Sequence, residues 1–230
     1  MKYIGEELEN FESANFWRRY TISFVKKYLK NKDVVEIGSG LGSFSELLLK
    51  HCKNLVLVEL DKSFTSSLKK KFYNNQKIKN IINGTVDDLR GKKFEAIVHF
   101  QVLEHIEDDQ KEIDKNLEIL NDQSKLIICV PAFMSLYSKF DKSIGHFRRY
   151  EKKDFEKFNL GNSKIVKMFY IDSIGYILYK IHSFFVDSTY PSQLSIMIWD
   201  KIFIPFSFVF DFLFNYKFGK NLIVIIEKHS

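Results

Sequence analysis

One stretch of the sequence decides the fold, Val34-Val35-Glu36-Ile37-Gly38-Ser39-Gly40-Leu41-Gly42-Ser43-Phe44. Its apolar, β-branched start predicts a buried strand. The glycines let the backbone turn and leave room for a ligand to approach closely. Helix-forming residues follow from Ser45 to Lys50. A strand, a glycine-rich turn and a helix in this order bind a nucleotide-like ligand at the carboxyl end of the strand.

The spacing of the glycines narrows the choice of ligand. The pattern is Glu-x-Gly-x-Gly-x-Gly, which differs from the Gly-x-Gly-x-x-Gly of dinucleotide sites, and no Gly-Lys-Ser/Thr follows, which excludes a P-loop. Glu36 precedes the first glycine by two residues, where a carboxylate suits a ligand with a cationic amino-acid end better than a pyrophosphate. The alternative is a glycine turn in an ordinary α/β protein that binds no ligand.

This stretch resembles motif I of the class I S-adenosylmethionine-dependent methyltransferases. The resemblance implies an α/β fold, a doubly wound, seven-stranded, mostly parallel sheet of the Rossmann-like methyltransferase type, whose seventh strand is antiparallel and lies between the fifth and the sixth. It also implies S-adenosylmethionine as cofactor and S-adenosylhomocysteine as product. Gly38, Gly40 and Gly42 would lie against the cofactor, and Glu36 would face its amino-acid end.

A second apolar run, Leu55 to Glu59, predicts the next strand, and it ends on a carboxylate. A carboxylate at this strand end can accept hydrogen bonds from both ribose hydroxyls. Glu59 is preferred over Asp61 for this role because Asp61 falls in the following turn.

The turn after the third predicted strand, Ile78 to Ile82, is acidic. The resemblance places the adenine site here, with an apolar side chain, Val86, on the base and an acidic one, Asp87, at its exocyclic amine. Asp88 is close enough to be confused with Asp87. The alternative is a solvated acidic turn without a ligand.

The fourth predicted strand, from Phe94 to Phe100, continues into Gln101-Val102-Leu103-Glu104-His105-Ile106. A Leu-Glu-His-Ile sequence here resembles a signature of many small-molecule methyltransferases. It implies that Phe100 and Gln101 border the methionine part of the cofactor. His105 is a candidate base on the substrate side, and the alternative is that Glu104 and His105 shape the loop.

A long polar and aromatic segment from Pro131 to Tyr150 follows the fifth strand, and loops of this length in a compact domain are usually functional or disordered. Its Gly-His-x-Arg-Arg-Tyr end resembles a subset of class I methyltransferases. We expect a substrate lid in which arginines clamp an anion and His146 serves as a base. The candidate substrate residues are Tyr137, His146, Arg148, Arg149 and Tyr150. The alternative is that Asp141 pairs with an arginine and His146 packs the loop.

The chain is predicted to be one methyltransferase domain over 1–230, with an N-terminal helical cap over 1–30 and a hydrophobic helical insert over 171–218. Asp211 and Pro205 interrupt the second apolar run of the insert. This run is too short to span a bilayer, because a spanning helix needs about 20 apolar residues. The insert is expected to wall a pocket or form a homodimer interface, with peripheral membrane contact as a further alternative.

The composition sets broad limits. The 230 residues carry a net charge of +6, which admits anionic partners without establishing nucleic acid. The two cysteines, Cys52 and Cys129, are expected to be free thiols. The N-terminus is acidic too early for a signal peptide, so a cytoplasmic protein is expected, at most peripheral to the inner face of the membrane. No metal site is predicted.

The sequence therefore predicts an enzyme that transfers a methyl group from S-adenosylmethionine to a small-molecule or lipid- or glycan-linked acceptor. The expected acceptor atom is oxygen, an anionic substrate is one option, and His146 or His105 is the expected base. Nucleic acid is not expected, because no Asn/Asp-Pro-Pro-Tyr/Phe follows the fourth strand, where amino-group methyltransferases acting on bases usually carry one. The alternatives are a non-catalytic binding module with the same fold and a methyltransferase associated with a membrane surface.

Overall fold

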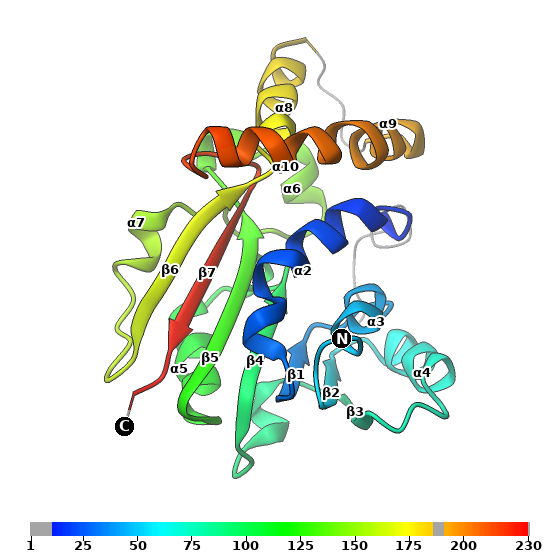
Figure 1. The fold of residues 1–230 in the computed structure, drawn as a ribbon, viewed down its shortest axis with the longest axis vertical. Helices are drawn as coiled ribbons and strands as arrows, with labels where there is room; N and C mark the ends of the chain where they lie inside the picture. The colour runs from blue at the N-terminus through cyan, green and yellow to red at the C-terminus, as the bar shows by residue number, and fades with distance from the viewer. Residues whose placement is uncertain (1–10, 186–190, 230) are drawn as a thin grey trace.

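A single sheet organises the computed structural model, which describes residues 11–185 and 191–229. Its seven strands lie in the order β3-β2-β1-β4-β5-β7-β6 (Figure 1). The strands are β1 (Asp33–Ile37), β2 (Asn54–Glu59), β3 (Ile78–Asn83), β4 (Phe94–Phe100), β5 (Leu120–Pro131), β6 (Lys164–Ile171) and β7 (Asn221–Glu227). β7 runs antiparallel to both β5 and β6, and the other pairs are parallel. This confirms the predicted sheet.

Helices cover both faces of the sheet, as expected of central strands whose residues are almost all apolar. On one face, the buried core joins the sheet to α2 (Asn15–Leu29), α3 (Ser43–Leu48) and α4 (Lys62–Lys71). On the other face, it joins the sheet to η1 (Val86–Leu89), α5 (Asp109–Glu118) and α7 (Lys152–Phe155). The chain leaves β1 toward β2 on one side and later returns to β4 on the other, so a crevice opens at the carboxyl ends of these strands.

The predicted elements agree with the structure within a few residues at most ends. β4 has the predicted bounds, whereas β5 begins five residues before the predicted Lys125. The helical cap expected over 1–30 is observed as α2 from Asn15 to Leu29, and the part of that prediction before residue 11 lies outside the described residues.

The start of α2 is stabilised by a residue far away in the chain. Ala14, which precedes the helix, offers no side-chain cap for the free backbone N–H groups of the first turn. Asp200 takes that role: its carboxylate accepts hydrogen bonds from the backbone N–H groups of Phe16, at 3.1 Å, and Trp17, at 2.8 Å. The N-terminal helix and the helical insert are therefore joined through a buried carboxylate.

The insert forms helices across the carboxyl ends of the parallel strands (Figure 1). α8 (Ser173–Phe185) follows β6, and α9 (Gln193–Ile198) continues through a π-helical turn over Trp199–Phe203 into α10 (Ile204–Leu213). Asp211 is fully buried and accepts hydrogen bonds from the Tyr20 hydroxyl at 2.6 Å and from the backbone N–H groups of Asp172 and Ser173. It therefore anchors α10 on α2 and β6, although the sequence suggested an interruption.

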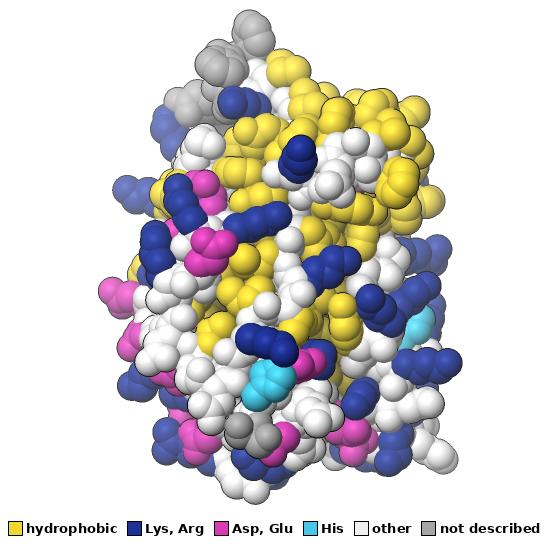
Figure 2. Space-filling view, turned by 60° about the vertical axis from the view of Figure 1, so that its left-hand side comes forward, with side chains coloured by type: hydrophobic (Ala, Val, Ile, Leu, Met, Phe, Trp, Pro, Cys, Tyr) yellow, Lys and Arg dark blue, Asp and Glu magenta, His cyan; other side chains and the backbone are white. Residues whose placement is uncertain are grey.

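The outer side of the insert exposes many large apolar side chains, which gather over the upper part of the molecule (Figure 2). They include Ile181, Leu194, Ile202, Phe206, Val209, Phe212 and Leu213. Among the described residues, no helix is both long and apolar enough to cross a membrane. The inner side contributes Trp199 to the pocket described below, so the insert is part of the pocket wall.

The segment between β5 and β6 is ordered by short helices. They are η3 (Met134–Leu136), α6 (Lys139–Ser143) and α7. The hydroxyl of Ser138 caps α6, and the carboxylate of Asp141 accepts in turn from the backbone N–H of Ser138. This capping box stabilises the start of α6, and Phe140, Asp141 and Ile144 of this segment line the pocket described below.

Candidate functional site

A cavity of about 500 Å³ lies at the carboxyl ends of β1, β2 and β4. The backbone of Gly38 and Gly40 forms its floor. Gly38 has a φ of +70°, and a Cβ at this position would lie 2.5 Å from Cγ2 of Val102. The turn therefore needs a glycine both for its left-handed backbone and for its close contact with the segment after β4.

Gly42 does not line the cavity, although the sequence placed it against the cofactor. It has a φ of +78° at the N-terminus of α3, and a Cβ there would lie 2.7 Å from Leu68 and 2.9 Å from Phe72 of the α4 segment. The third glycine therefore allows α3 and α4 to pack closely, and it lies outside the lining of the cavity in which the cofactor is expected.

Glu36 is buried beneath the glycine turn and lines the cavity. Burial raises the pKa of its carboxyl group to about 8, and a hydrogen bond from the Ser45 hydroxyl opposes this shift. An ammonium group that binds nearby would stabilise the ionised carboxylate. The site thus has a group suited to the cationic end of an amino acid, at the predicted position.

Glu59 lies at the end of β2 and also lines the cavity. Its two carboxylate oxygens accept hydrogen bonds from the backbone N–H groups of Gly40, at 2.7 Å, and Asp61, at 2.8 Å. Each oxygen retains a further lone pair for a ligand hydroxyl. Asp61 instead caps α4 through the N–H of Ser63. The geometry therefore favours Glu59 over Asp61 for the ribose.

The acidic turn after β3 separates its two aspartates. Val86 and Asp87 line the cavity, whereas Asp88 accepts a hydrogen bond from the backbone N–H of Thr85 within a capping box. Asp87 pairs with Lys115, and the hydrogen bond from this lysine is the main cause of its lowered pKa. An ionised Asp87 beside an apolar Val86 is compatible with the expected adenine contacts.

Phe100 and Gln101 border the cavity from the end of β4. The ring of Phe100 stacks on Phe44 with centroids 4.2 Å apart. Gln101 has a φ of +57°, an uncommon conformation for a residue other than glycine. Its side-chain amide donates to the Cys129 carbonyl oxygen at 3.2 Å and to Asn221 at 3.3 Å. These bonds hold the strained residue at the point where β4, β5 and β7 meet.

The predicted lid contributes two of its five candidate residues, His146 and Arg149, to the cavity. Both bind the carboxylate of Asp141, which is fully buried: His146 Nδ1 lies 2.9 Å from Oδ1, and Arg149 makes two hydrogen bonds of 2.9 and 3.0 Å. Burial alone would raise the pKa of Asp141, but the hydrogen bonds from His146 and Arg149 lower it well below its usual range. This is the pairing that the sequence left as the alternative.

The other three lid residues bind elsewhere in the protein. Arg148 pairs with Asp109 at 2.5 Å, and the Tyr150 hydroxyl donates to the same carboxylate at 2.9 Å. The Tyr137 hydroxyl donates to the backbone oxygen of His146 at 2.6 Å. None of these three side chains lines the cavity. The predicted anion clamp of two adjacent arginines is therefore wrong in its geometry.

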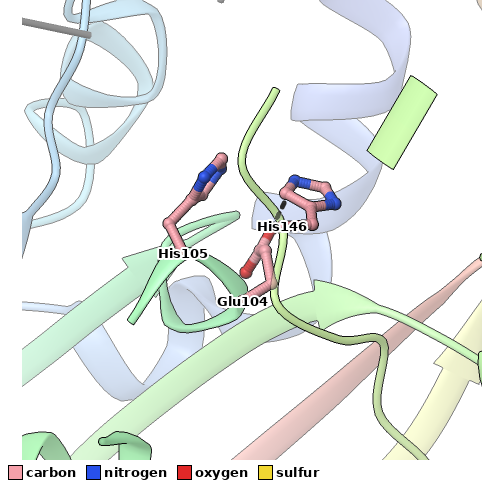
Figure 3. A group of neighbouring side chains, drawn as sticks. All are labelled: Glu104, His105 and His146. Carbon is pink, nitrogen blue, oxygen red and sulfur yellow. Dashed lines mark ion pairs between the residues drawn. The ribbon is translucent and has the colours of Figure 1, made fainter. Parts of the chain in front are cut away.

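Glu104 and His105 belong to the segment after β4, and they lie beside His146 of the lid segment (Figure 3). The rings of His105 and His146 meet edge to face with centroids 4.5 Å apart, and both line the cavity. Burial lowers the pKa of His105 to about 3 and raises the pKa of the fully buried Glu104 to about 7. His105 is therefore mostly neutral near pH 7.

Besides Lys115, two basic residues outside the set of candidate site residues line the cavity, Arg18 of α2 and Lys220 before β7. Arg18 is buried and donates to the backbone oxygens of Phe11 and Glu12. The ammonium of Lys220 lies 4.8 Å from the Trp199 ring centroid. Separate elements bring these two residues to the crevice.

Comparisons with known proteins find relatives of the N-terminal part of the chain. The sequence model of the family described as ribosomal RNA adenine dimethylase matches residues 20–112. The probable ribosomal RNA small subunit methyltransferase A of Methanococcoides burtonii is 41% identical over 71 residues, which cover 30% of this chain and 26% of that protein. Ribosomal RNA small subunit methyltransferase A of Coxiella burnetii is 48% identical over 48 residues, 21% of this chain and 18% of that protein. The chain thus spans about a quarter or less of the length of these relatives.

Solved structures share the fold over nearly the whole chain. A putative methyltransferase in complex with the Haloferax volcanii Trm112 methyltransferase activator has a TM-score of 0.68 at 11% identity and covers 99% of this chain and 96% of its own. A SAM-dependent methyltransferase from Archaeoglobus fulgidus has a TM-score of 0.64 at 18% identity. The match covers 97% of this chain and 100% of that protein.

The fold is that of the class I S-adenosylmethionine-dependent methyltransferases, and this prediction is confirmed. Over residues 20–112 the chain carries a domain like that of the ribosomal RNA adenine dimethylases. S-Adenosylmethionine as cofactor is confirmed at the level of this class of enzymes. The narrower subset expected from the Gly-His-x-Arg-Arg-Tyr loop has no counterpart in these findings.

The same findings contradict the predicted acceptor. A small-molecule or lipid-linked acceptor without nucleic acid was expected, but the matching relatives are named as ribosomal RNA methyltransferases. The two alternatives, a non-catalytic module and a membrane-surface enzyme, gain no support from them. The acceptor prediction depended on the lid, and there Arg148 and Tyr150 bind Asp109 rather than facing the cavity.

Proposed function

We propose that this protein transfers the methyl group of S-adenosylmethionine to RNA, with adenine in ribosomal RNA as the first substrate to be tested. The observation that carries the proposal is the match of residues 20–112 to the ribosomal RNA adenine dimethylase family. The curated relatives support the same substrate class. A net charge of +6 suits a polyanionic partner.

The residues of the cavity fit the cofactor. The carboxyl group of Glu36 suits the ammonium group of the cofactor, and that of Glu59 suits its ribose hydroxyls. Val86 and Asp87 suit its adenine. Gly38 and Gly40 leave space for its amino-acid end. When bound, S-adenosylmethionine supplies a methyl group already activated by the adjacent sulfonium. The protein's task is therefore to orient the acceptor in line with that methyl group and to exclude water.

The acceptor would enter on the side of the cavity lined by His105, His146 and Arg149. Lys220 adds a cationic group on this side that could contact a phosphate. The segment after β4 reads Gln101-Val102-Leu103-Glu104 and lacks the Asn/Asp-Pro-Pro-Tyr/Phe that usually holds an exocyclic amine. The methylated atom must therefore be determined from the product.

The direct test incubates the purified chain with S-adenosylmethionine carrying a tritiated methyl group and with protein-free small-subunit ribosomal RNA. We expect radioactivity in the RNA, and nucleoside mass spectrometry then identifies the methylated base and atom. Gly40→Arg should abolish incorporation by filling the cavity. A chain that binds S-adenosylhomocysteine in calorimetry but labels neither naked RNA nor 30S particles would contradict the proposal.

A further inference from the structure

We infer that Glu104, His105 and His146 form a binding site for one divalent transition-metal ion on the acceptor side of the cavity. Each of these residues offers one ligand atom, and the three atoms lie within 4.8 Å of one another. Glu104 and His105 follow β4, whereas His146 belongs to the distant lid segment (Figure 3). The fold alone brings the three together, so the sequence did not suggest a metal site.

The distance between the ligand atoms of Glu104 and His146 is close to the one that a shared ion requires. His146 Nε2 lies 3.8 Å from Glu104 Oε1. Zinc binds nitrogen and oxygen ligands at about 2.0–2.2 Å, so two ligands of one ion lie roughly 3 to 3.5 Å apart. A change of a few tenths of an ångström in that pair would meet this requirement.

Glu104 provides an independent reason to expect a ligand. Its side chain is fully buried, and neither carboxylate oxygen accepts a hydrogen bond from another described residue. A buried carboxylate without hydrogen bonds is costly, because it loses its hydration and His146 Nε2, at 3.8 Å, is too far away to replace the lost hydrogen bonds. A divalent cation would satisfy both its charge and its lone pairs.

Groups that contact the two histidines orient their rings as metal ligands. Because the Asp141 carboxylate is an acceptor, His146 donates its Nδ1–H to it and keeps a lone pair on Nε2, which faces Glu104. A carboxylate that fixes the tautomer of a ligating histidine is common in metal sites. Arg149 already neutralises Asp141, so the charge of Glu104 is available to the ion. Hydrogen bonds to the backbone at Gly145 and Ile144 fix the ring of His105.

The three ligands indicate which kind of ion would bind and which side of the ion an acceptor could reach. Two imidazoles and one carboxylate suit zinc or another first-row transition metal rather than magnesium or calcium. Since His105 and His146 line the cavity, the remaining coordination positions would face it. Three protein ligands with an open position allow the ion to bind an oxygen of the acceptor and hold it near the cofactor.

The test uses the untagged full-length chain, stripped with a chelator and titrated with Zn²⁺ alone in a calorimeter. We expect one ion per chain with a dissociation constant in the micromolar range or below. His105→Ala and Glu104→Gln should each weaken binding at least tenfold. His51→Ala is the matched control, because His51 lies outside the cavity lining, and it should leave binding unchanged.

Binding of S-adenosylhomocysteine by each variant checks that it is folded. As a second measurement, Co²⁺ added to the stripped wild-type chain should give a visible absorption spectrum that one equivalent of Zn²⁺ removes. Absence of stoichiometric Zn²⁺ binding by the wild-type chain would overturn the inference, as would a folded His105→Ala variant with unchanged affinity. Neither readout involves RNA methylation, so this result is independent of the proposed function.

Discussion

Gly38→Ala is the substitution that best tests the structure of the glycine turn. Gly38 has a φ of +70°, and the new Cβ would lie 2.5 Å from Cγ2 and 3.2 Å from Cγ1 of Val102. The left-handed conformation costs an alanine about 1–2 kcal/mol. Moving Val102 out of the way costs about 1–3 kcal/mol more, as in other overpacked sites. We therefore expect the free energy of unfolding to fall by about 2–5 kcal/mol.

Two further variants separate these costs. Gly91 has a φ of +79°, and a Cβ there would meet no atom within 4 Å, so Gly91→Ala measures the backbone cost alone, about 1–2 kcal/mol. Val102→Ala removes both methyl groups that the new Cβ would meet. In a double-mutant cycle, Gly38→Ala should therefore cost less in the Val102→Ala background than in the wild type.

Urea denaturation followed by the fluorescence of Trp17 and Trp199 measures these free energies. The reasoning is refuted if Gly38→Ala and Gly91→Ala destabilise the protein equally, because the contact with Val102 would then have no energetic effect. Calorimetry with S-adenosylhomocysteine should also show weaker binding to Gly38→Ala and unchanged binding to Gly91→Ala, since Gly38 lines the cavity and Gly91 does not.

Three other predictions concern buried groups. Burial raises the pKa of Cys52 to about 11 and also raises that of Cys129, so neither thiol should react with a dithiopyridine reagent at pH 8 until the protein is unfolded; fast reaction of the native protein would contradict this. The pKa of Glu36 rises from 4.5 to about 8 on folding, so the native state keeps a proton that the unfolded chain has lost. The free energy of unfolding should therefore decrease from pH 4.5 to pH 8, and more steeply in the wild type than in Glu36→Gln; equal slopes in chemical denaturation would disprove it. Asp211→Leu leaves the Tyr20 hydroxyl and two backbone N–H groups without their acceptor, so it should destabilise the protein by about 3–5 kcal/mol in urea, against less than about 1 kcal/mol for the exposed Phe212→Ser.

The sequence predicts the sheet well because the information for it is local. Apolar runs bounded by turn residues mark each strand, and the glycine turn with Glu36 and Glu59 locates the cofactor end of the sheet. The sequence alone does not distinguish the roles of Asp87 and Asp88. The structure does, because Asp88 accepts a hydrogen bond from the backbone N–H of Thr85 in a capping box, whereas Asp87 lines the cavity.

The acceptor side could not be predicted in the same way because its contacts are tertiary. Arg148 and Arg149 are adjacent in the sequence, yet they bind different carboxylates, Asp109 and Asp141. Neighbouring residues in an extended segment point in opposite directions, so a pair of arginines does not ensure a joint clamp. Asp211 looked like an interruption of an apolar helix, because its partners are far away in the chain.

The cap that Asp200 provides for α2 has a consequence for the order of folding during synthesis. The first turn of α2 contains Phe16 and Trp17, whereas Asp200, whose carboxylate accepts their N–H groups, is made more than 180 residues later. Until about 200 residues have left the ribosome, the amides of Phe16 and Trp17 lack this acceptor. The first turn of α2 therefore reaches its final structure only after the helical insert has been synthesised.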